Sequence, residues 1–418
     1  MEQHVVDVAS RMNVVFVGHV DHGKSTTIGR LCYDTGTLSP DKMAEVERVS
    51  RELGRPTEFA FVMDHLEEER TGGLTIDTAQ MFFRSASRHY VIIDAPGHKE
   101  FLKNMITGAT QAEAALLVID AAEGLREQSR RHAFLLSMFN VRSIVVVLNK
   151  MDLTGYSKAR FEAVCGQMVE FLAALGLEPA FVVPISAAYG DNVVHRSNRM
   201  PWYDGPTVLE ALDALEKRAA PIDRPLRFPI QDVYRIDERN IIVGRVEAGT
   251  VRQGDTACVL PTGQSVQVLS VEELGRTRFD AQAGESVGLT LEPSSGLRRG
   301  QVLCDPYDQP QCAARWGCSL FCMTDREVRR GEPLLVRLAT QERPARVVQI
   351  MERIDASTLK VLEHDAALLA HAEVGKVILE ADPPLIAEPF AATPEMGRFV
   401  LEMAEDVVGA GTVIGVES

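Results

Sequence analysis

A glycine-rich loop near the start of the chain constrains the fold more than any other feature. Residues 18–25 (GHVDHGKS) fit G-x-x-x-x-G-K-[ST] and lie between an apolar run and a helix-like segment. In this pattern backbone N–H groups wrap a β-phosphate, Lys24 neutralises the β- and γ-phosphates, and the Ser25 hydroxyl ligates Mg²⁺. The helix that follows points its positive end at the same anion. The predicted loop residues are Gly18, His19, Val20, Asp21, His22, Gly23, Lys24, Ser25 and Thr26.

A second motif, DAPG, closes a later apolar strand. Its Asp94 can hold Mg²⁺ through water, and the Gly97 N–H can sense the γ-phosphate. This motif follows the glycine-rich loop in the order that a nucleoside-triphosphate domain requires. We therefore expect Ser25 and Asp94 to share one magnesium ion.

A third motif, NKMD, specifies the base. Asn149, Lys150 and Asp152 close another strand, and the Asp152 carboxylate can accept both N–H donors of the guanine edge, which adenine does not present. A wrong base would leave that carboxylate unpaired, at a cost of about 1–3 kcal/mol. Ser186 and Ala187, after the next strand, fit a backbone contact to the guanine oxygen. The three motifs together predict a GTP site.

The first half of the chain alternates apolar runs with amphipathic stretches. That pattern is typical of a mostly parallel sheet with helices on both faces, and the Val, Ile and Leu content of the runs fits strands covered on both sides. The predicted strands are Asn13–Val17, Tyr90–Asp94, Ala114–Asp120, Ser143–Asn149 and Ala180–Ser186, and the predicted helices are Lys99–Thr107, Ser129–Phe139 and Lys158–Leu175.

The second half reads as two β-barrels. Three prolines in Ala220–Pro229 suggest a linker, and short alternating strands follow it. Glu247–Asp255 is predicted to be a hairpin turn. A second proline-containing break near Asp305–Gln311 precedes another β-rich stretch. We predict an α/β domain at residues 1–220 and barrels at 221–307 and 308–418.

Chain length, net charge and cysteine content limit the class of protein and its cellular compartment. A chain of 418 residues is too long for one hydrophobic core, and a net charge of −15 argues against a nonspecific nucleic-acid binder. Seven scattered cysteines and the lack of a signal-peptide pattern favour the reducing cytoplasm. The most apolar stretches are too short to cross a bilayer, so no membrane association is expected.

The motifs resemble those of one known class. Residues 18–26 (GHVDHGKST), 94–107 (DAPGHKEFLKNMIT) and 149–152 (NKMD) are similar to the translation-factor class of GTPases, close to elongation factor 1-alpha and its sulfate-activating cousins. The resemblance implies that Thr75 ligates Mg²⁺ in the GTP state and that His98 orients the attacking water. It also implies that Val20 and Leu74 form an apolar gate beside His98. Catalysis is thus expected to depend on His98, Thr75 and Lys24.

Two branches of this class are weighed, together with a scaffold that binds GTP without hydrolysing it. One branch is the GTPase subunit of sulfate adenylyltransferase, which would couple GTP hydrolysis to the formation of adenosine 5′-phosphosulfate and pair with a smaller ATP-binding subunit. The alternative branch delivers aminoacyl-tRNA to the ribosome. The presence of both Thr75 and His98 argues against the non-hydrolysing scaffold.

Several features bear on the choice of branch. Carriers of tRNA place arginines where this chain has Glu402 and Asp406, and acidic groups would repel a phosphate backbone. Residues 331–347 lack the histidine-containing segment typical of the carriers, and residues 259–292 and 343–359 resemble the sulfate-type subunit. His19 and His22, in contrast, resemble the elongation-factor loop. The balance favours the sulfate-type subunit.

Overall fold

The structure is a computed structural model that describes residues 11–38, 44, 48, 80–94, 112–217, 219–236, 239–273 and 276–417. The chain divides into two compact units, Met1–Arg218 and Ala219–Ser418. Both predicted barrels lie in the second unit, so the division of the chain into three domains stays a prediction.

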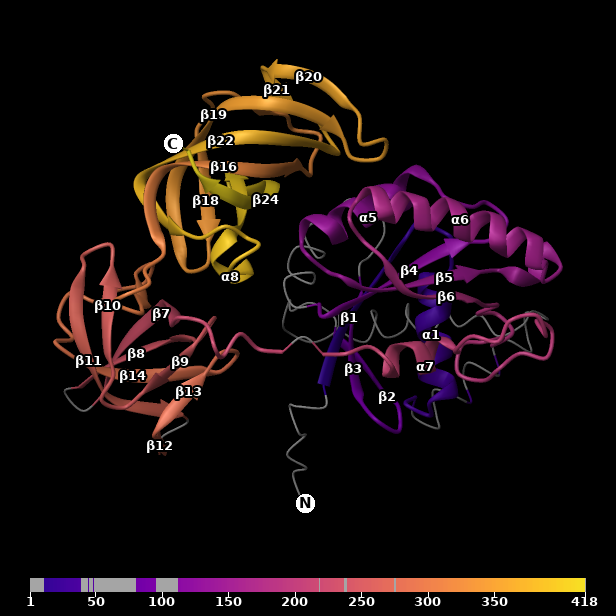
Figure 1. The fold of residues 1–418 in the computed structure, drawn as a ribbon, viewed down its shortest axis with the longest axis horizontal. Coiled ribbons are helices and arrows are strands. Elements are labelled where there is room, and N and C mark those ends of the chain that lie inside the picture. The colour runs from indigo at the N-terminus through magenta and orange to yellow at the C-terminus, as the bar shows by residue number, and fades with distance from the viewer. Residues whose placement is uncertain are drawn as a thin grey trace. The chain divides into compact units, whose positions relative to one another are not determined.

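The first unit is built on a six-stranded sheet in the order β2-β3-β1-β4-β5-β6 (Figure 1). β2 is antiparallel to β3 at one edge, and the other neighbours run parallel. Every residue of β4 is buried, as expected for a central strand covered on both faces. The strand bounds are β1 Arg11–Gly18, β2 Gln80–Arg84, β3 His89–Asp94, β4 Ala114–Asp120, β5 Ser143–Asn149 and β6 Pro179–Pro184.

Helices cover both faces of this sheet. α1 (Lys24–Asp34) and α7 (Val208–Asp213) bury apolar side chains in one cluster with the sheet. α5 (Glu127–Met138) and α6 (Lys158–Ala174) lie on the opposite face (Figure 1). The α/β layering predicted from the sequence is therefore confirmed. The loops after the carboxyl ends of β1, β4, β5 and β6 then meet at one edge of the sheet, where α/β proteins bind ligands.

Most predicted elements of this unit agree with the structure. β4 and β5 have the predicted bounds, and α5 begins at Glu127 instead of Ser129. β6 ends at Pro184, so Ser186 lies in the loop beyond it. The predicted helix Lys99–Thr107 lies outside the described residues. The edge strand β2 was not predicted, because its antiparallel pairing adds a short segment with no parallel-strand pattern of its own.

The first barrel of the second unit is a closed sheet in the order β10-β15-β7-β8-β14-β11. Pairing of β10 with β11 closes the ring, and β12 (Arg276–Arg278) is attached beside it. Its inward side chains form a single apolar cluster that includes Phe228 and Leu289. The strands are β7 Arg227–Ile236, β8 Arg239–Arg245, β10 Thr256–Leu260, β11 Gln264–Glu273, β14 Ser286–Glu292 and β15 Val302–Cys304.

The predicted hairpin turn at Glu247–Asp255 is more elaborate than expected. It contains a short strand, β9 (Thr250–Arg252), which pairs with β13 (Asp280–Gln282) instead of folding back on β8. Gly249 and Gly254 both have positive φ, as a tight turn requires. The difference arises because β13, far along the sequence, supplies the pairing partner.

The second barrel closes in the same way. Its sheet runs β18-β23-β24-β16-β22-β19, β18 pairs with β19, and β20 (Val361–Ala366) is attached beside the ring. Trp316 is fully buried in its core. A small sheet of β17 (Val328–Arg329) and β21 (Leu368–Leu369) and a short helix, α8 (Pro394–Gly397), complete it. The ring strands are β16 Gln311–Cys322, β18 Leu334–Leu338, β19 Gln341–Asp355, β22 Glu373–Ala387, β23 Arg398–Met403 and β24 Asp406–Val416.

A buried arginine joins the two barrels. The Arg227 guanidinium donates to Glu388 at 2.7 Å and to the Asp308 carboxylate at 2.6 Å, and its side chain is 4% exposed. An apolar cluster that includes Cys258 and Ile386 lies across the same junction. Because a buried guanidinium needs both partners, this contact ties the start of the first barrel to the second.

Candidate functional site

The glycine-rich loop connects β1 to α1 in a conformation that only glycine allows. Gly18 has φ +152°, and a Cβ there would lie 2.2 Å from the Val118 carbonyl oxygen. Gly23 caps α1 with φ +88°, and a Cβ there would lie 2.3 Å from Nδ2 of Asn149. The two glycines therefore keep open a backbone cradle at the N-terminus of a helix, which is the geometry that binds phosphate.

Lys24 spans this cradle. Its Nζ donates to the carbonyl oxygens of Gly18 at 2.8 Å and His19 at 3.0 Å. This position holds a positive charge over the loop, where a triphosphate would lie. Ser25, in the first turn of α1, is partly exposed and can present its hydroxyl to a metal ion. The open cradle, the ammonium group and the hydroxyl fit a Mg²⁺–triphosphate.

Asn149 links the phosphate loop to the base motif. Its Nδ2 donates to the His22 carbonyl at 3.0 Å. Its Oδ1 accepts from the N–H groups of Lys150 at 2.8 Å and Ala187 at 3.0 Å. A buried amide thus uses both ends to hold three loops together, and the phosphate loop among them lies 127 residues away in the sequence. The predicted phosphate and guanine motifs form one site.

The carboxylate predicted to recognise guanine, that of Asp152, is held in place. Asp152 Oδ1 accepts from the Ser186 hydroxyl at 2.6 Å, so one carboxylate oxygen is oriented by the loop that follows β6. Because this bond restricts rotation, Asp152 is prepared to accept the two N–H groups of a guanine. Ser186 therefore orients the predicted base-binding carboxylate, a role beyond the backbone contact predicted for it.

Asp120, which was not predicted, positions Lys150. Its carboxylate is 2.9 Å from Lys150 Nζ and also accepts from the backbone N–H groups of Ala122 and Glu123. Burial alone would raise the pKa of Asp120, but the Lys150 hydrogen bond and the two backbone bonds outweigh burial and lower it. Asp120 is therefore a charged partner for Lys150. An acidic residue at the end of a predicted strand was a signal available in the sequence.

A buried histidine on α5 also supports the loop. His132 Nδ1 accepts from the Gly18 N–H at 3.1 Å. Burial, together with the positive charge of Lys24, lowers the pKa of His132 to about 3, so the ring is neutral and keeps its acceptor nitrogen. Nothing in the sequence distinguished His132 from any other helical histidine, because its partner lies 114 residues away.

The two histidines of the loop itself lie against each other. Their rings meet edge to face with centroids 5.1 Å apart. His22 is 1% exposed and approaches the Val118 carbonyl, and burial lowers the pKa of its ring. Burial therefore favours the neutral form of the His22 ring. His19, Val20, Asp21 and Thr26 lie in the loop and the first turn of α1, as predicted.

Part of the predicted site lies outside the described residues. β3 ends at Asp94, but the Asp94 side chain, Gly97, Thr75 and His98 are not among the parts described. Their roles stay predictions. Within the described residues, no cluster of three or more His, Cys, Asp or Glu side chains is placed to hold a metal ion.

Comparison with known proteins decides the family. Residues 9–218 match the model of the elongation factor Tu GTP binding domain, and residues 317–414 match the GTP-eEF1A C-terminal domain-like model. The chain is 38% identical to elongation factor 1-alpha of Pyrococcus furiosus, over 97% of this chain and 98% of that protein. The chain belongs to the elongation factor Tu/1-alpha family. It is a translation-factor-class GTPase, as the sequence motifs predicted.

A second relative named elongation factor 1-alpha gives a similar match. Elongation factor 1-alpha of Archaeoglobus fulgidus is 38% identical over 96% of this chain and 97% of that protein. A crystal structure of sup35 complexed with GDP covers 100% of this chain and 97% of that chain, with a TM-score of 0.46 and 24% identity. Between the two predicted branches, the relatives named elongation factor 1-alpha favour the tRNA-carrying alternative over the sulfate-type subunit. In the described parts of the chain, no helix is long and apolar enough to span a membrane.

Proposed function

We propose that this chain is a GTP-hydrolysing carrier of aminoacyl-tRNA that works at the ribosome in the cytoplasm. The observation that carries the proposal is the match over 97% of the chain to proteins named elongation factor 1-alpha, together with a site in which Asn149 joins the phosphate loop to the guanine motif. A match that includes both barrels supports a shared partner as well as a shared nucleotide.

The described residues supply most of the binding chemistry. The N–H groups of the loop and the Lys24 ammonium hold the β- and γ-phosphates, and Asp152 selects guanine. Ser25, with Thr75 and Asp94, would hold Mg²⁺, which neutralises charge on the phosphates when it is bound. His98 would orient the attacking water. Rearrangement of the segments carrying Thr75 and His98 would then report the state of the nucleotide to the barrels.

The hydrolytic role of His98 is testable separately from binding. His98→Ala should keep GTP affinity and slow single-turnover hydrolysis by about 10²-fold or more, the range expected for a positioned orienting group. His195, which is exposed on the same unit, offers a matched control as His195→Ala. Equal hydrolysis rates in His98→Ala and the parent protein would remove His98 from the mechanism.

The carrier function is tested by protection of the aminoacyl ester. A chain that binds aminoacyl-tRNA in its GTP state should slow spontaneous deacylation of the tRNA when loaded with a non-hydrolysable GTP analogue, and should not do so with GDP. Lys24→Ala serves as the control that cannot hold the nucleotide. Equal deacylation rates with the analogue, with GDP and without protein would contradict the proposal.

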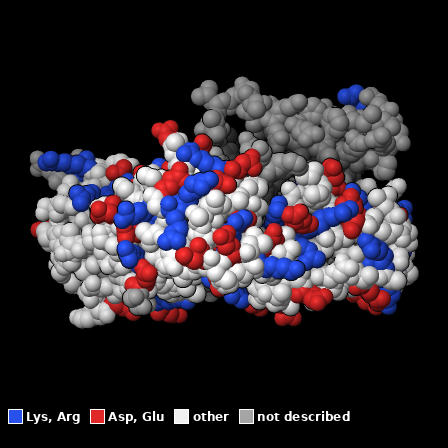
Figure 2. Space-filling model, turned by 90° about the horizontal axis from the view of Figure 1, so that it is seen from above, with Lys and Arg blue, Asp and Glu red and all other residues white. Residues whose placement is uncertain are grey.

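The acidic residues of the second barrel favour a second candidate, the sulfate-type GTPase subunit. Glu402 is held by Arg337 at 2.9 Å, and Asp406 is exposed at the start of β24. Figure 2 shows Lys and Arg interspersed with Asp and Glu among the described residues of the face it presents, with no broad basic surface there for RNA. This candidate requires a smaller ATP-binding partner. Native purification followed by mass spectrometry distinguishes the two, since recovery of such a partner without tRNA would favour the sulfate-type role.

A further inference from the structure

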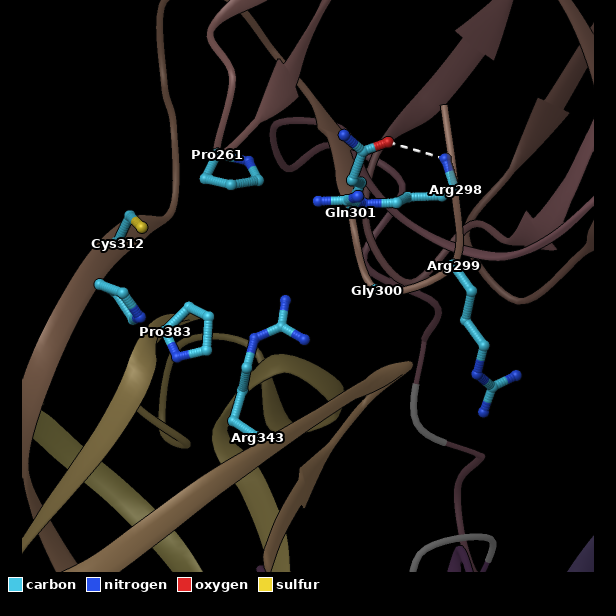
Figure 3. Close-up of a pocket in the computed structure, with 9 residues that line it drawn as sticks. Pro261, Arg298, Arg299, Gly300, Gln301, Cys312, Arg343 and Pro383 are labelled. Atoms are coloured by element: carbon cyan, nitrogen blue, oxygen red, sulfur yellow. Dashed lines mark hydrogen bonds between the residues drawn. The ribbon is translucent and has the colours of Figure 1, made fainter. Parts of the chain in front are cut away.

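A cavity of about 260 Å³ lies between the two barrels of the second unit, in a part of the chain that the nucleotide site does not use. The loop before β15 forms one side, and the ends of β16, β19 and β22 form the other (Figure 3). The lining residues are Pro261, Arg298, Arg299, Gly300, Gln301, Cys312, Arg343, Pro383 and Pro384.

The charge of this lining is entirely positive. Its three arginines are accompanied by no acidic residue. Arg299 is engaged elsewhere, because it donates to the Gln231 carbonyl at 3.2 Å and lies 3.9 Å from Glu342, and Figure 3 shows it pointing away from the cavity. Among the described residues neither Arg298 nor Arg343 pairs with a carboxylate. Two guanidinium groups are therefore left to face the cavity without a counter-charge.

One N–H group of Arg343 lacks a hydrogen-bond acceptor within the described part of the chain. Its Nη1 donates to the Glu342 carbonyl at 3.0 Å, but its Nε is buried and has no partner. Figure 3 shows the side chain rising from β19 toward the loop that carries Gly300. Thr340, whose carbonyl lies beside Gly300, also has a buried hydroxyl without a partner. Leaving a buried donor unpaired costs free energy, so an acceptor placed here would be held strongly.

Apart from the Gln301 amide, most of the remaining lining is apolar and rigid. Pro261 lies on the side of the first barrel, and Pro383, Pro384 and Cys312 lie on the side of the second (Figure 3). Proline side chains present flat apolar surface and lose little conformational freedom when a ligand packs on them. The cavity thus combines a doubly cationic end with an apolar end.

We propose that this cavity binds a small molecule that carries a phosphate or sulfate group on an apolar body. Arg343 and Arg298 hold the oxyanion, and the prolines pack against the body. The planar guanidinium group matches the geometry of tetrahedral oxyanions, and two guanidinium groups balance the double negative charge of a phosphate monoester. Occupancy would bridge the two barrels and stabilise their junction.

Cys312 provides a reporter inside the site. It is the exposed cysteine of the chain, whereas Cys165 is half-buried and the other cysteines are buried. The residue is exposed as a whole, but partial burial of its thiol raises the pKa of Cys312, and the charge of Arg343 opposes that rise. Alkylation is therefore measured at mildly alkaline pH, as a ratio of the rates with and without ligand. The full chain is first saturated with GDP, which occupies the phosphate loop. The rate of maleimide addition at Cys312 is then followed by peptide mass spectrometry.

Phenyl phosphate is the probe, because it joins a phosphate monoester to an apolar ring. It should slow alkylation of Cys312 about tenfold or more, with a half-maximal effect at about millimolar concentration or below. Inorganic phosphate should protect more weakly, since it lacks the apolar body. Phenol, and sodium chloride at the same ionic strength, should have no effect.

Two variants assign the protection to the arginines. Arg343→Gln and Arg298→Gln should each raise the concentration needed for half-protection about tenfold, the loss expected for one charge-assisted contact. Arg346→Gln is the matched control, because Arg346 lies on the same strand as Arg343 but pairs with Glu380. Phenyl phosphate should protect Cys312 in this variant at the same concentration as in the parent protein. Unchanged GDP binding and melting temperature show that the variants are folded, and exposed Arg298 is the safer of the two substitutions.

Three results would overturn the proposal. The first is an alkylation rate that phenyl phosphate does not change. The second is equal protection of the parent, Arg343→Gln and Arg298→Gln. The third is protection by an RNA oligonucleotide with none by phenyl phosphate, which would assign the arginines to a nucleic-acid surface instead.

Discussion

At the scale of single residues, the predicted specificity for guanine depends on carboxylate and amide groups whose partners lie far away in sequence. Asp152 is oriented by Ser186, and Asn149 is held between His22 and Ala187. The identity of these residues could be predicted, because the motif requires them. The bonds that orient them could not, because they depend on how the strand ends meet.

Substitution at Asp152 should change base preference. Asp152→Asn replaces an acceptor of two N–H groups with a side chain that also donates, so the variant should bind xanthosine triphosphate in preference to GTP. Competition binding with both nucleotides measures the preference. Asp204, a carboxylate of the same unit outside the site, gives Asp204→Asn as the control. A retained preference for guanine in Asp152→Asn would remove Asp152 from base recognition.

His132 should affect nucleotide affinity through the loop. His132→Phe removes the acceptor for the Gly18 N–H, which costs about 1–3 kcal/mol and should weaken GTP binding by about 5-fold to 100-fold. Because burial lowers the pKa of this ring to about 3, the contribution of His132 should not vary with pH around neutrality. Calorimetry of GTP binding at several pH values measures both effects. Parent-like affinity in the variant would show that the bond is dispensable.

At the scale of elements, the loop between β1 and α1 is set by two backbone positions. Gly18 and Gly23 were predicted from the pattern, and the structure gives the reason, since Cβ atoms at either position would collide with Val118 or Asn149. The central strands β4 and β5 were predicted with their full bounds because buried parallel strands are continuous apolar runs. Two short strands were missed: β2, a five-residue edge strand that pairs antiparallel with β3, and β9, whose partner β13 lies far along the sequence.

Gly23→Ala should strongly weaken nucleotide binding. Its Cβ would enter the space of the Asn149 amide and would also strain a left-handed backbone, so the loop and the base motif should both shift. Gly36→Ala is the matched control, since Gly36 has φ +66° with no atom within 4 Å of an added Cβ, and it carries the strain without the collision. GTP affinity should fall by about 10²-fold in Gly23→Ala, a loss of about 2.7 kcal/mol, and stay close to the parent value in Gly36→Ala. Equal affinity in the two variants would refute the collision.

At the scale of the whole molecule, the second unit depends on the junction between its barrels. Arg227 joins Asp308 and Glu388 across that junction, and Glu247 lies in it with Glu395 of α8 nearby. The two barrels and their closure follow from the strand pattern and the pairing of β10 with β11 and β18 with β19. Nothing in the sequence indicated that these charged side chains would be buried and paired at the junction.

Glu247 should make the stability of this unit depend on pH. Burial, with the charge of Glu395, raises the pKa of Glu247 from 4.5 to about 7. The pKa of Glu247 is higher in the folded protein than in the unfolded protein, so the protonated form of Glu247 favours folding. This contribution to the unfolding free energy is fully present below about pH 4.5 and is lost as the pH rises to about 7. Glu247→Gln should remove that loss, on the order of 3 kcal/mol, and be more stable than the parent above pH 7.

Urea denaturation at a series of pH values checks this expectation. The difference in unfolding free energy between Glu247→Gln and the parent should grow as the pH rises from 4.5 to 7. Glu405→Gln, at an exposed position of the same unit, should show no such trend. A difference that stays constant with pH would show that Glu247 keeps an ordinary pKa in the folded protein.

The sequence alone determined the phosphate loop, the guanine motif and the layering of the first unit. Each of these depends on neighbours within a few residues, through glycine conformations, strand periodicity and fixed motif spacing. The tertiary structure alone decided that Asn149 joins the two motifs, that Asp120 and His132 support them, and that Arg343 faces a cavity without a counter-charge. Those contacts link residues that only chain topology brings together, so no local pattern in the sequence records them.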